Sequence, residues 1–357
     1  MKILHVITSL RTGGAEHLMV DLLPELRSLG DEVELLVFDG TRTTFMDELE
    51  STGVKVQSLS VGRNVYSPLN IFGLCKFVNK FVNKFDIVHT HNTACQLFAP
   101  LARCLNFGGA KLVTTEHNAT NRRRDKKFLK WVDHWMYSKY LRIICISDQT
   151  KSNLVKYLGR NSKIKTIYNG ISIKRFLLPI KQIKEKQRLI VTMIAAFRTQ
   201  KDQDTLIKAV AELPANYRVR LVGDGSRRDE LQRLAVAFQV ADRVDFLGIR
   251  SDIPKLLAES DINVLSSHWE GLSLSSIEGM ASGRPFVASD VDGLREIVGG
   301  NGVLFPVGDA HKLAHEIRSL CENPEHYREV AIKCQEKAKQ YDISVMARRY
   351  HELYLSL

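Results

Sequence analysis

The segment EGLSLSSIE places two carboxylates, Glu270 and Glu278, around the start of a predicted helix. Glu270 falls in a loop after the strand-like run INVLSS, and either Ser273 or Ser275 can cap the helix that carries Glu278. The first turn of such a helix offers free backbone N–H groups and a positive dipole end, which suit a diphosphate. This order of groups matches a nucleotide sugar. One carboxylate would meet the sugar hydroxyls, the helix start would meet the diphosphate, and the other carboxylate would meet the ribose hydroxyls. Taken without other motifs, Glu270 and Glu278 are explained more simply as solvent-exposed acids beside a capped surface helix.

Two other loops carry charged or small residues where strand-like runs end. FRTQKD contains Arg198 and Lys201, cations placed where a leaving diphosphate would gather negative charge. An exposed basic loop explains these two residues equally well. Gly223 follows the next strand-like run, but Arg228 takes the third glycine place of a dinucleotide fingerprint, so the sequence lacks that motif.

The first half of the chain offers glycines and histidines in similar places. Gly13 and Gly14 precede a helical pattern, where glycine lets backbone approach an anionic ligand; a plain tight turn is an equal explanation. His89 and His91 alternate at the end of a strand-like run. No acidic or cysteine partner accompanies them. We therefore expect no metal, and favour a structural role or a place in an acceptor cleft.

Short apolar runs alternate with helical periods along the chain, which predicts parallel sheets with helices on both faces. The runs are KILHVITSL, EVELLVFD, FDIVHTH, AKLVTTEH and IICIS, then RLIVTMIAA, YRVRLVGDG, VDFLG, INVLSS and RPFVASD. We predict an α/β protein with two doubly wound Rossmann-like domains facing a central cleft. Its predicted parts are an N-terminal domain (1–178), a linker (179–188), a C-terminal domain (189–340) and a C-terminal helix (341–357) packing back on the N-terminal domain.

Length and composition bound the class of protein. The 357 residues fit two domains, and 44% hydrophobic with 25% charged residues is ordinary for a soluble globular chain. The six cysteines are not at metal-ligand spacing, which favours free thiols in a reducing compartment. The apolar run of MKILHVITSL is too short for a secretory signal, and no run reaches the ~20 residues that span a bilayer. We expect a cytoplasmic protein.

The positive charge is concentrated in the first half. Residues 1–175 hold 26 Lys and Arg against 15 Asp and Glu, whereas residues 176–357 hold 25 of each. The stretches LCKFVNKFVNKF and NRRRDKKFLKWVDHWMYSK combine basic and aromatic residues at helical spacing. They are typical of helices on an anionic membrane, unless the aromatics are core and the lysines a solvated face. No nucleic-acid-binding motif accompanies them, so we expect no nucleic acid partner.

Taken together, these motifs resemble the retaining glycosyltransferases of the GT-B fold, family four, over most of the chain. Segments similar to its first domain are GGAE at 13–16, DIVHTHN at 86–92, TTEH at 114–117, ISDQTKSNL at 146–154 and IYNGI at 167–171. Segments similar to its donor domain are FRTQKDQDTLIKA, LVGDGSRRDEL, VDFLG and SDINVLSSHWEGLSLSSIEGMASGRPFVASDVDGLREIV. The last of these is the most specific.

The resemblance implies roles on the donor side. Glu270 would hydrogen-bond the donor sugar, and Glu278 would hold the ribose hydroxyls. Backbone at Gly271, Leu272 and Ser273 would meet the sugar and the diphosphate.

It also implies that cations and glycines surround the diphosphate, in place of a divalent metal. Lys201, together with Arg198, would neutralise the diphosphate as it departs. Many family members carry an arginine where this chain has Ala196, which leaves open whether Arg198 replaces it. The other implied residues are Gly13, Gly14 and Gly223 on the donor side and His117 near the transferred sugar.

The resemblance therefore implies a retaining, metal-independent hexosyltransferase without a cofactor. It would move a sugar from a UDP- or GDP-sugar to a glycan or polyprenyl-linked acceptor, in bacterial-type cell-surface polysaccharide synthesis. The basic N-terminal domain would meet the inner face of the cell membrane. A sugar-nucleotide epimerase of the same fold, and a non-catalytic protein that binds sugar nucleotides or nucleic acid, remain alternatives.

Overall fold

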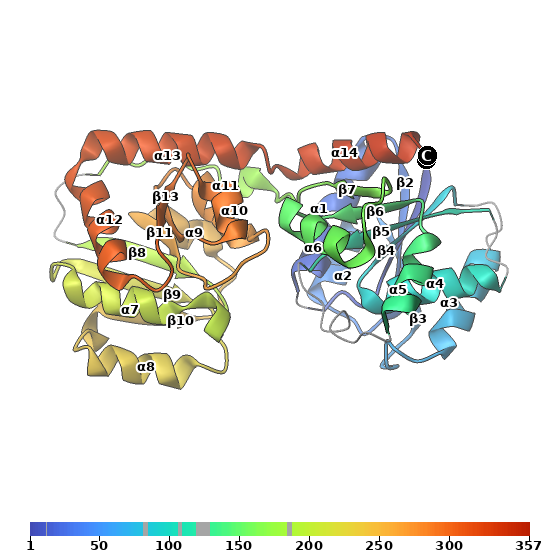
Figure 1. Ribbon diagram of the computed structural model, residues 1–357, viewed down its shortest axis with the longest axis horizontal. Helices are drawn as coiled ribbons and strands as arrows, with labels where there is room; N and C mark the ends of the chain where they lie inside the picture. Colours follow the sequence, from blue (N-terminus) through green and yellow to red (C-terminus); the bar gives the residue numbers. More distant parts are fainter. Residues whose placement is uncertain (12, 81–84, 106–108, 119–128, 184–187) are drawn as a thin grey trace. The chain divides into compact units, whose positions relative to one another are not determined.

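Two parallel β-sheets form the framework of the protein in a computed structural model (Figure 1). The structure describes residues 1–11, 13–80, 85–105, 109–118, 129–183 and 188–357. This part of the chain divides into two compact units, Met1–Gly170 with Ile343–Leu357 and Ile171–Asp342.

In the first unit the described strands pair in the order β3-β2-β1-β4-β5-β6-β7, all parallel. The strands are β1 (Lys2–Ile7), β2 (Glu32–Asp39), β3 (Lys55–Ser60), β4 (Ile87–His91), β5 (Lys111–Glu116), β6 (Arg142–Cys145) and β7 (Ile164–Thr166). The helices are α1 (Gly14–Ser28), α2 (Thr44–Ser51), α3 (Leu69–Lys80), α4 (Thr93–Cys104), α5 (Leu129–Ser138), α6 (Asp148–Leu158) and α14 (Ile343–Leu355).

Both faces of the first sheet are buried, which explains the continuous apolar runs of its central strands. Alternate residues of β1 enter different cores: Ile3 and Ile7 join one cluster, and Leu4 and Val6 the other. Helices α1, α2 and α14 cover the first cluster, and α3 to α6 cover the second.

In the second unit the described strands pair in the order β10-β9-β8-β11-β12-β13, again all parallel. The strands are β8 (Leu189–Ile194), β9 (Tyr217–Val222), β10 (Val244–Gly248), β11 (Ile262–Leu265), β12 (Phe286–Ser289) and β13 (Val303–Phe305). The α-helices are α7 (Gln203–Glu212), α8 (Arg228–Ala237), α9 (Ile253–Glu259), α10 (Leu274–Ala281), α11 (Asp292–Val298), α12 (Ala310–Glu322) and α13 (Pro324–Lys339). Short 3-10 turns are η2 (Ile173–Arg175), η3 (Thr199–Lys201) and η4 (Ala241–Arg243).

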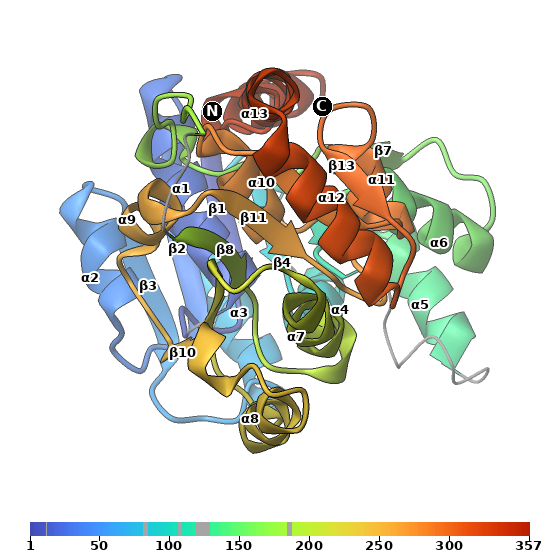
Figure 2. The same ribbon diagram turned by 90° about the vertical axis from the view of Figure 1, so that its left-hand side faces the viewer.

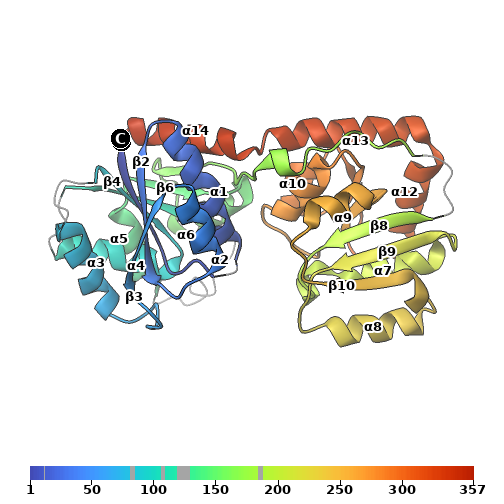
Figure 3. The same cartoon turned by 180° about the vertical axis from the view of Figure 1, so that it is seen from behind.

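Helices cover both faces of the second sheet as well. Figure 3 shows α9 and α13 on one side of β8, β9 and β10, and α8 on the other. After β13 the chain returns as α12, which packs beside α7 (Figure 2). The two sheets with their helices confirm the predicted α/β fold class.

Three short strands were absent from the predicted runs: β3, β7 and β13. In β3, KVQSLS, no residue is fully buried, because the strand lies at the sheet edge. Strands β7 and β13 are three residues long, too short to show a period.

The division between the units differs from the predicted boundary at residue 178. Residues 171–178 belong to the second unit, because Ile171 N donates to Tyr341 O at 2.9 Å and Gln335 Nε2 donates to Leu178 O at 2.7 Å. The predicted linker is also held there, since Lys181 Nζ lies 3.0 Å from Asp261 Oδ1. Residues 184–187 of that linker lie outside the described residues.

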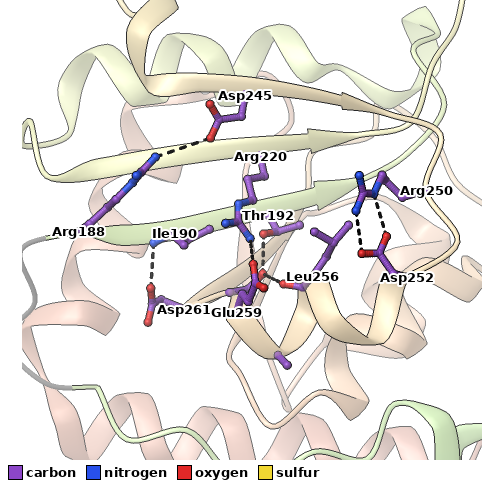
Figure 4. A network of polar contacts seen from close by, with 12 residues as sticks. Arg188, Ile190, Thr192, Arg220, Asp245, Arg250, Asp252, Leu256, Glu259 and Asp261 are labelled. Carbon is purple, nitrogen blue, oxygen red and sulfur yellow. Dashed lines mark hydrogen bonds and ion pairs between the residues drawn. The ribbon is translucent and has the colours of Figure 1, made fainter.

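Polar contacts link β8 and β9 of the second unit to residues that precede β11 (Figure 4). Ile190 N donates to Asp261 Oδ2 at 2.9 Å, and Arg220 Nη1 donates to Glu259 Oε2 at 2.6 Å. Both acceptors come from the end of α9 or the turn after it, so these bonds tie α9 to the sheet.

The two basic, aromatic stretches are described only in part, because residues 81–84 and 119–128 lie outside the described residues. Phe77 packs against the core, Phe85 is buried, and Trp135 also packs against the core. Trp131 is 77% exposed. Core packing therefore accounts for Phe77, Phe85 and Trp135, but not for Trp131. Within the described chain, we find no helix with the length and apolarity needed to cross a membrane.

The C-terminal helix α14 completes the first unit. It packs against α1, and its Met346, Tyr350 and Tyr354 are buried in the first core cluster. Tyr350 OH lies 2.9 Å from Thr115 Oγ1 of β5, so the helix contributes hydrogen bonds as well as apolar area.

We predict that Tyr350→Ala lowers the free energy of unfolding of the first unit by about 3–5 kcal/mol, since it leaves a cavity and an unpaired threonine. Leu355→Ala on the same helix is the control; Leu355 is 63% exposed, so we expect less than about 0.5 kcal/mol. Urea unfolding of a Trp269→Phe background, which keeps Trp131 and Trp135 of the first unit, measures both. Equal effects of the two substitutions would contradict the packing.

Candidate functional site

Four loops emerge from the carboxyl ends of the second unit's strands. They follow β8, β9, β11 and β12, and cover residues 195–202, 223–227, 266–273 and 290–291. The loop after β11 contains Glu270, and α10, which follows it, carries Glu278. Ligands of doubly wound sheets bind outside this edge.

Lys201 and Glu270 form an ion pair between the loops after β8 and β11. Ser267 Oγ donates to the same Glu270 oxygen at 3.2 Å. The side chains of Lys201 and Glu270 are 17% and 10% exposed. Both charges are therefore largely removed from water, and each is the counter-ion of the other.

Three hydrogen bonds to backbone carbonyl oxygens hold these two loops together. His268 N donates to Gln200 O at 2.8 Å, and Gln200 Nε2 donates to Trp269 O at 2.9 Å. Ser266 Oγ donates to Asp202 O at 2.7 Å. Because these bonds bracket the ion pair on both sides, its two members have little freedom to separate by backbone motion alone.

Asp202 fixes the end of the basic loop. Its backbone is left-handed, with φ of 49°, and its carboxylate caps α7 by accepting a hydrogen bond from Thr205 N at 3.4 Å, while its other oxygen accepts one from Thr205 Oγ1 at 2.6 Å. Burial raises the pKa of this carboxyl group, although the bonds from Thr205 and the nearby His268 act in the opposite direction.

The start of α10 is capped by Ser273, which accepts a hydrogen bond from Ser276 N at 3.3 Å. This settles the choice between Ser273 and Ser275; the latter lies 3.1 Å from the capping hydroxyl. Leu272 beside the cap is buried. Glu278 is half-buried on α10, one turn or more beyond the cap.

Glycines allow close backbone approaches around these loops. A Cβ on Gly223, whose φ is +137°, would lie 2.1 Å from Ala195 O, and one on Gly225 would lie 2.4 Å from Phe197 O. A Cβ on Gly293 of α11 would lie 2.2 Å from Gly271 O. Close packing therefore requires glycine at position 223, whether or not this predicted donor-binding residue contacts a ligand. Gly293 allows α11 to pack against the loop that contains Glu270.

Arg198 is exposed at the start of η3, next to the buried Phe197. Among the described residues, its guanidinium makes no hydrogen bond or ion pair. Ala196 is exposed in the same loop. Because no described residue pairs with the Arg198 guanidinium, this side chain can contact a ligand without breaking an existing bond.

At the carboxyl edge of the first unit, α1 begins at Gly14 after the extended Gly13. A Cβ on Gly14 would meet nothing within 4 Å, so the space in front of it is open. Asn92, which has φ of 67°, joins this loop to β4: its Nδ2 lies 3.1 Å from Thr8 Oγ1 and 3.3 Å from Glu16 Oε1. The open helix start suits an anion.

A cluster of four histidines runs from the middle of β1 and β4 to this edge, and one of them, His5, was not among the predicted site residues. His5 of β1 pairs in register with His89 of β4. His5 Nδ1 lies 3.0 Å from His91 Nε2, and His91 Nδ1 lies 2.9 Å from His117 Nε2. A common strand order of doubly wound sheets places the first strand beside the fourth, and this was the signal that could have added His5.

Burial keeps these imidazoles neutral. Removal from water lowers the pKa of His5 to about 3 and that of His117 to about 4, and lowers those of His89 and His91 well below the usual value. Ligand atoms of His5, His89 and His91 lie within 4.8 Å of one another. A metal there would have to break the bonds of His89 to Tyr354 OH at 2.5 Å and to Thr115 Oγ1 at 2.8 Å.

Comparison with known families assigns both halves of the chain. Residues 12–175 match the family described as Glycosyltransferase Family 4, and residues 175–340 match the family described as Glycosyl transferases group 1. The chain belongs to the group 1, family 4 type glycosyltransferases. This confirms the resemblance and the GT-B fold class.

Several relatives of this glycosyltransferase carry informative names. One is 27% identical over 95% of this chain and 94% of its own: N,N'-diacetylbacillosaminyl-diphospho-undecaprenol alpha-1,3-N-acetylgalactosaminyltransferase of Campylobacter jejuni. UDP-Gal:alpha-D-GlcNAc-diphosphoundecaprenol alpha-1,3-galactosyltransferase of Escherichia coli is 28% identical over 66% of this chain and 65% of its own. HepE of Anabaena, solved in complex with UDP, superimposes over 100% of both chains with a TM-score of 0.85 at 23% identity.

We predict that Lys201→Met lowers the free energy of unfolding of the glycosyltransferase's second unit by about 1–3 kcal/mol, because Glu270 keeps a buried charge without its cation. Adding Glu270→Gln should recover part of the loss, since an amide tolerates burial better. Arg198→Met in the neighbouring position is the control, with an effect under about 0.5 kcal/mol. Urea unfolding followed through Trp269, in a background with Trp131 and Trp135 replaced by Phe, measures these three variants, the single Glu270→Gln variant and the parent protein. Strictly additive effects of the Lys201 and Glu270 substitutions would rule out the pairing.

Proposed function

We propose that this glycosyltransferase moves a sugar from a nucleoside diphosphate sugar, with retention of configuration and without a metal, to a glycan or lipid-linked acceptor of cell-surface polysaccharide synthesis. The observation that carries this proposal is the Lys201–Glu270 ion pair beside the capped start of α10, at the carboxyl edge of the second sheet.

The geometry suggests how this edge would hold the donor. The diphosphate lies at the N-terminal end of α10, where unpaired N–H groups and the positive dipole end attract it. Lys201 turns from Glu270 to the phosphate oxygens and stabilises the charge that develops as the nucleoside diphosphate leaves. Arg198, exposed and without another partner in the described chain, adds a second cation.

The two glutamates take different parts of the donor. Glu270, once Lys201 has turned away, accepts hydrogen bonds from hydroxyls of the transferred sugar. Glu278, further along α10, accepts hydrogen bonds from the ribose hydroxyls. In the first unit taken by itself, the open space before Gly14 suits an anion, and the half-buried His117 just beyond β5 suits a sugar hydroxyl.

Donor and acceptor classes are proposed from the relatives. HepE binds UDP, and the Escherichia coli relative is named for UDP-Gal, which favours a uridine nucleotide. The Escherichia coli and Campylobacter jejuni relatives are named for undecaprenol-linked acceptors, which favours a lipid diphosphate. Retention is proposed on the resemblance to the retaining family, with the acceptor attacking from the face that the leaving group vacates.

We predict that Glu278→Ala weakens binding of the uridine nucleotide sugar about 10- to 100-fold, as expected for lost hydrogen bonds to a charged acceptor. Glu329→Ala on α13, an exposed glutamate paired with Lys333, is the control and should leave binding unchanged. Thermal shifts with a panel of UDP-, GDP- and ADP-sugars identify the ligand, and calorimetry gives the affinities.

Three outcomes would overturn parts of the proposal. Unchanged affinity in Glu278→Ala would remove the donor-site assignment. Conversion of the donor sugar without any acceptor would favour an epimerase. Binding without turnover on any lipid-linked or glycan acceptor would favour a non-catalytic binding protein.

A membrane surface is the proposed location of the acceptor. Helices α3, α4 and α5 cover one face of the first sheet, with α4 between the other two. Large apolar side chains are exposed there: Tyr66 and Leu69 at the start of α3, Phe72 within it, and Trp131 on α5, at 60%, 58%, 62% and 77%. Residues 101–175 add 17 basic against 4 acidic residues. Apolar side chains within a basic surface suit an anionic lipid interface.

We predict binding to vesicles that contain anionic lipid, weakening with salt, and absent on neutral vesicles. Replacing Phe72 and Trp131 together by Ser should weaken vesicle binding about tenfold or more, because two aromatic side chains that would become buried in the lipid interface are removed. Val236→Ser, at a site of the second unit that is 65% exposed, should have no effect. Co-sedimentation measures all of these, and binding that ignores lipid charge would contradict the prediction.

A further inference from the structure

Three imidazoles form one hydrogen-bonded chain in the first unit. His5 Nδ1 contacts His91 Nε2 at 3.0 Å, and His91 Nδ1 contacts His117 Nε2 at 2.9 Å. The two end nitrogens, His5 Nε2 and His117 Nδ1, are buried and lack a hydrogen-bond partner in the described part of the chain. The proton position on one ring therefore determines the proton position on the next.

A chain of three neutral imidazoles has two ordered arrangements with the same number of protons. In the first, each ring donates from Nδ1, so His5 Nε2 is bare and His117 Nδ1 carries a proton. In the second, each ring donates from Nε2, so His5 Nε2 carries a proton and His117 Nδ1 is bare. Neutrality of all three rings agrees with the low pKa values that burial imposes on them.

The closed end at His5 decides between the two arrangements. His5 is fully buried within the sheet, so an N–H at its Nε2 would be a donor that neither protein nor ligand can satisfy. Buried donors without partners are rarer in proteins than buried acceptors that are under-satisfied. At the other end, Nδ1 of His117 is itself buried, but the residue is half-buried just beyond the end of β5, so a small movement of its ring would let water or a ligand supply a partner.

We propose that His5 and His91 are positioning residues that hold His117 as the Nδ1–H tautomer, so that it presents a hydrogen-bond donor to an oxygen of the bound sugar. The tautomer is inferred from the three hydrogen-bonded imidazoles and the burial of the two end residues, without reference to any ligand. The choice of a sugar oxygen as the acceptor rests on the proposed function. A neutral N–H donor suits a hydroxyl or ring oxygen, and it places no added charge beside the leaving diphosphate.

His89 provides a matched comparison within the same cluster. Its ring stacks on His91 at 4.5 Å between centroids, yet it is hydrogen-bonded to Tyr354 and Thr115 instead of to the chain. Substituting His89 thus disturbs the packing of the cluster but leaves the three hydrogen-bonded imidazoles of His5, His91 and His117 in place.

The direct test is nitrogen NMR of the ¹⁵N-histidine-labelled protein without ligand, with assignment by His117→Gln. We expect His117 Nδ1 to have the shift of a protonated nitrogen and Nε2 that of a bare one. A protonated Nε2 on His117 overturns the proposal. Because this measurement needs no substrate, it stands even where the proposed transfer reaction fails.

The second test compares His5→Phe with His89→Phe, two substitutions of a buried imidazole by a ring of similar size. His5→Phe removes the donor to His91 Nε2, so we expect His117 to become a mixture of both tautomers. His89→Phe should leave the tautomer of His117 as it is in the parent protein. Unchanged His117 nitrogen shifts in His5→Phe would overturn the role of His5.

With the nucleotide sugar and acceptor of the proposed reaction, His5→Phe should lower kcat/KM about fivefold, as for one lost hydrogen bond. His89→Phe should change it by less than about twofold, even where its melting temperature falls as much. Equal losses in both variants would make the chain purely structural and overturn the positioning role. Absence of transfer in the parent protein, with the Nδ1–H tautomer present, would count against the proposed function alone.

Discussion

The geometry of a parallel sheet is the constraint on which the candidate site depends. All strands of the second unit end at one edge, so the loops that follow β8, β9, β11 and β12 meet there although nearly a hundred residues separate the first from the last. Such crowding of loops needs close backbone contact. Gly223 and Gly293 provide it, since a Cβ at either position would lie about 2 Å from a carbonyl oxygen of a neighbouring loop.

The sequence predicted the fold well because its signal is local. Apolar runs and helical periods are visible within ten to fifteen residues, and the loop position of Glu270 and the helical position of Glu278 followed from them. Choices that depend on distant contacts could not be made in that way. Ser273 and Ser275 are equal as caps by spacing, and residues 171–178 join the second unit through bonds to Gln335 and Tyr341.

The histidine cluster is a second case in which contacts between distant residues could not be predicted from local sequence patterns. Buried polar groups cost stability unless they are hydrogen-bonded, and a buried strand that carries His89 and His91 needs partners from elsewhere. One partner of His89, Tyr354, comes from α14 near the end of the sequence, and Tyr350 of the same helix is bonded to Thr115, which is the other partner of His89. Periodicity predicts that α14 is a helix, but it does not reveal that its tyrosines complete the polar interior of the first unit.

The ion pair of Lys201 and Glu270 links stability to ligand binding. Each side chain is too buried to stay charged at low cost without the other, so a ligand that draws Lys201 away must also satisfy Glu270. Ser267 supplies one hydrogen bond to that carboxylate, which leaves further acceptor capacity for hydroxyl groups. A bare diphosphate satisfies Lys201 but offers no donor to Glu270, whereas a nucleotide sugar satisfies both. Under the proposed function, the pair would give the complete donor an advantage over the nucleotide alone that neither charge would provide by itself.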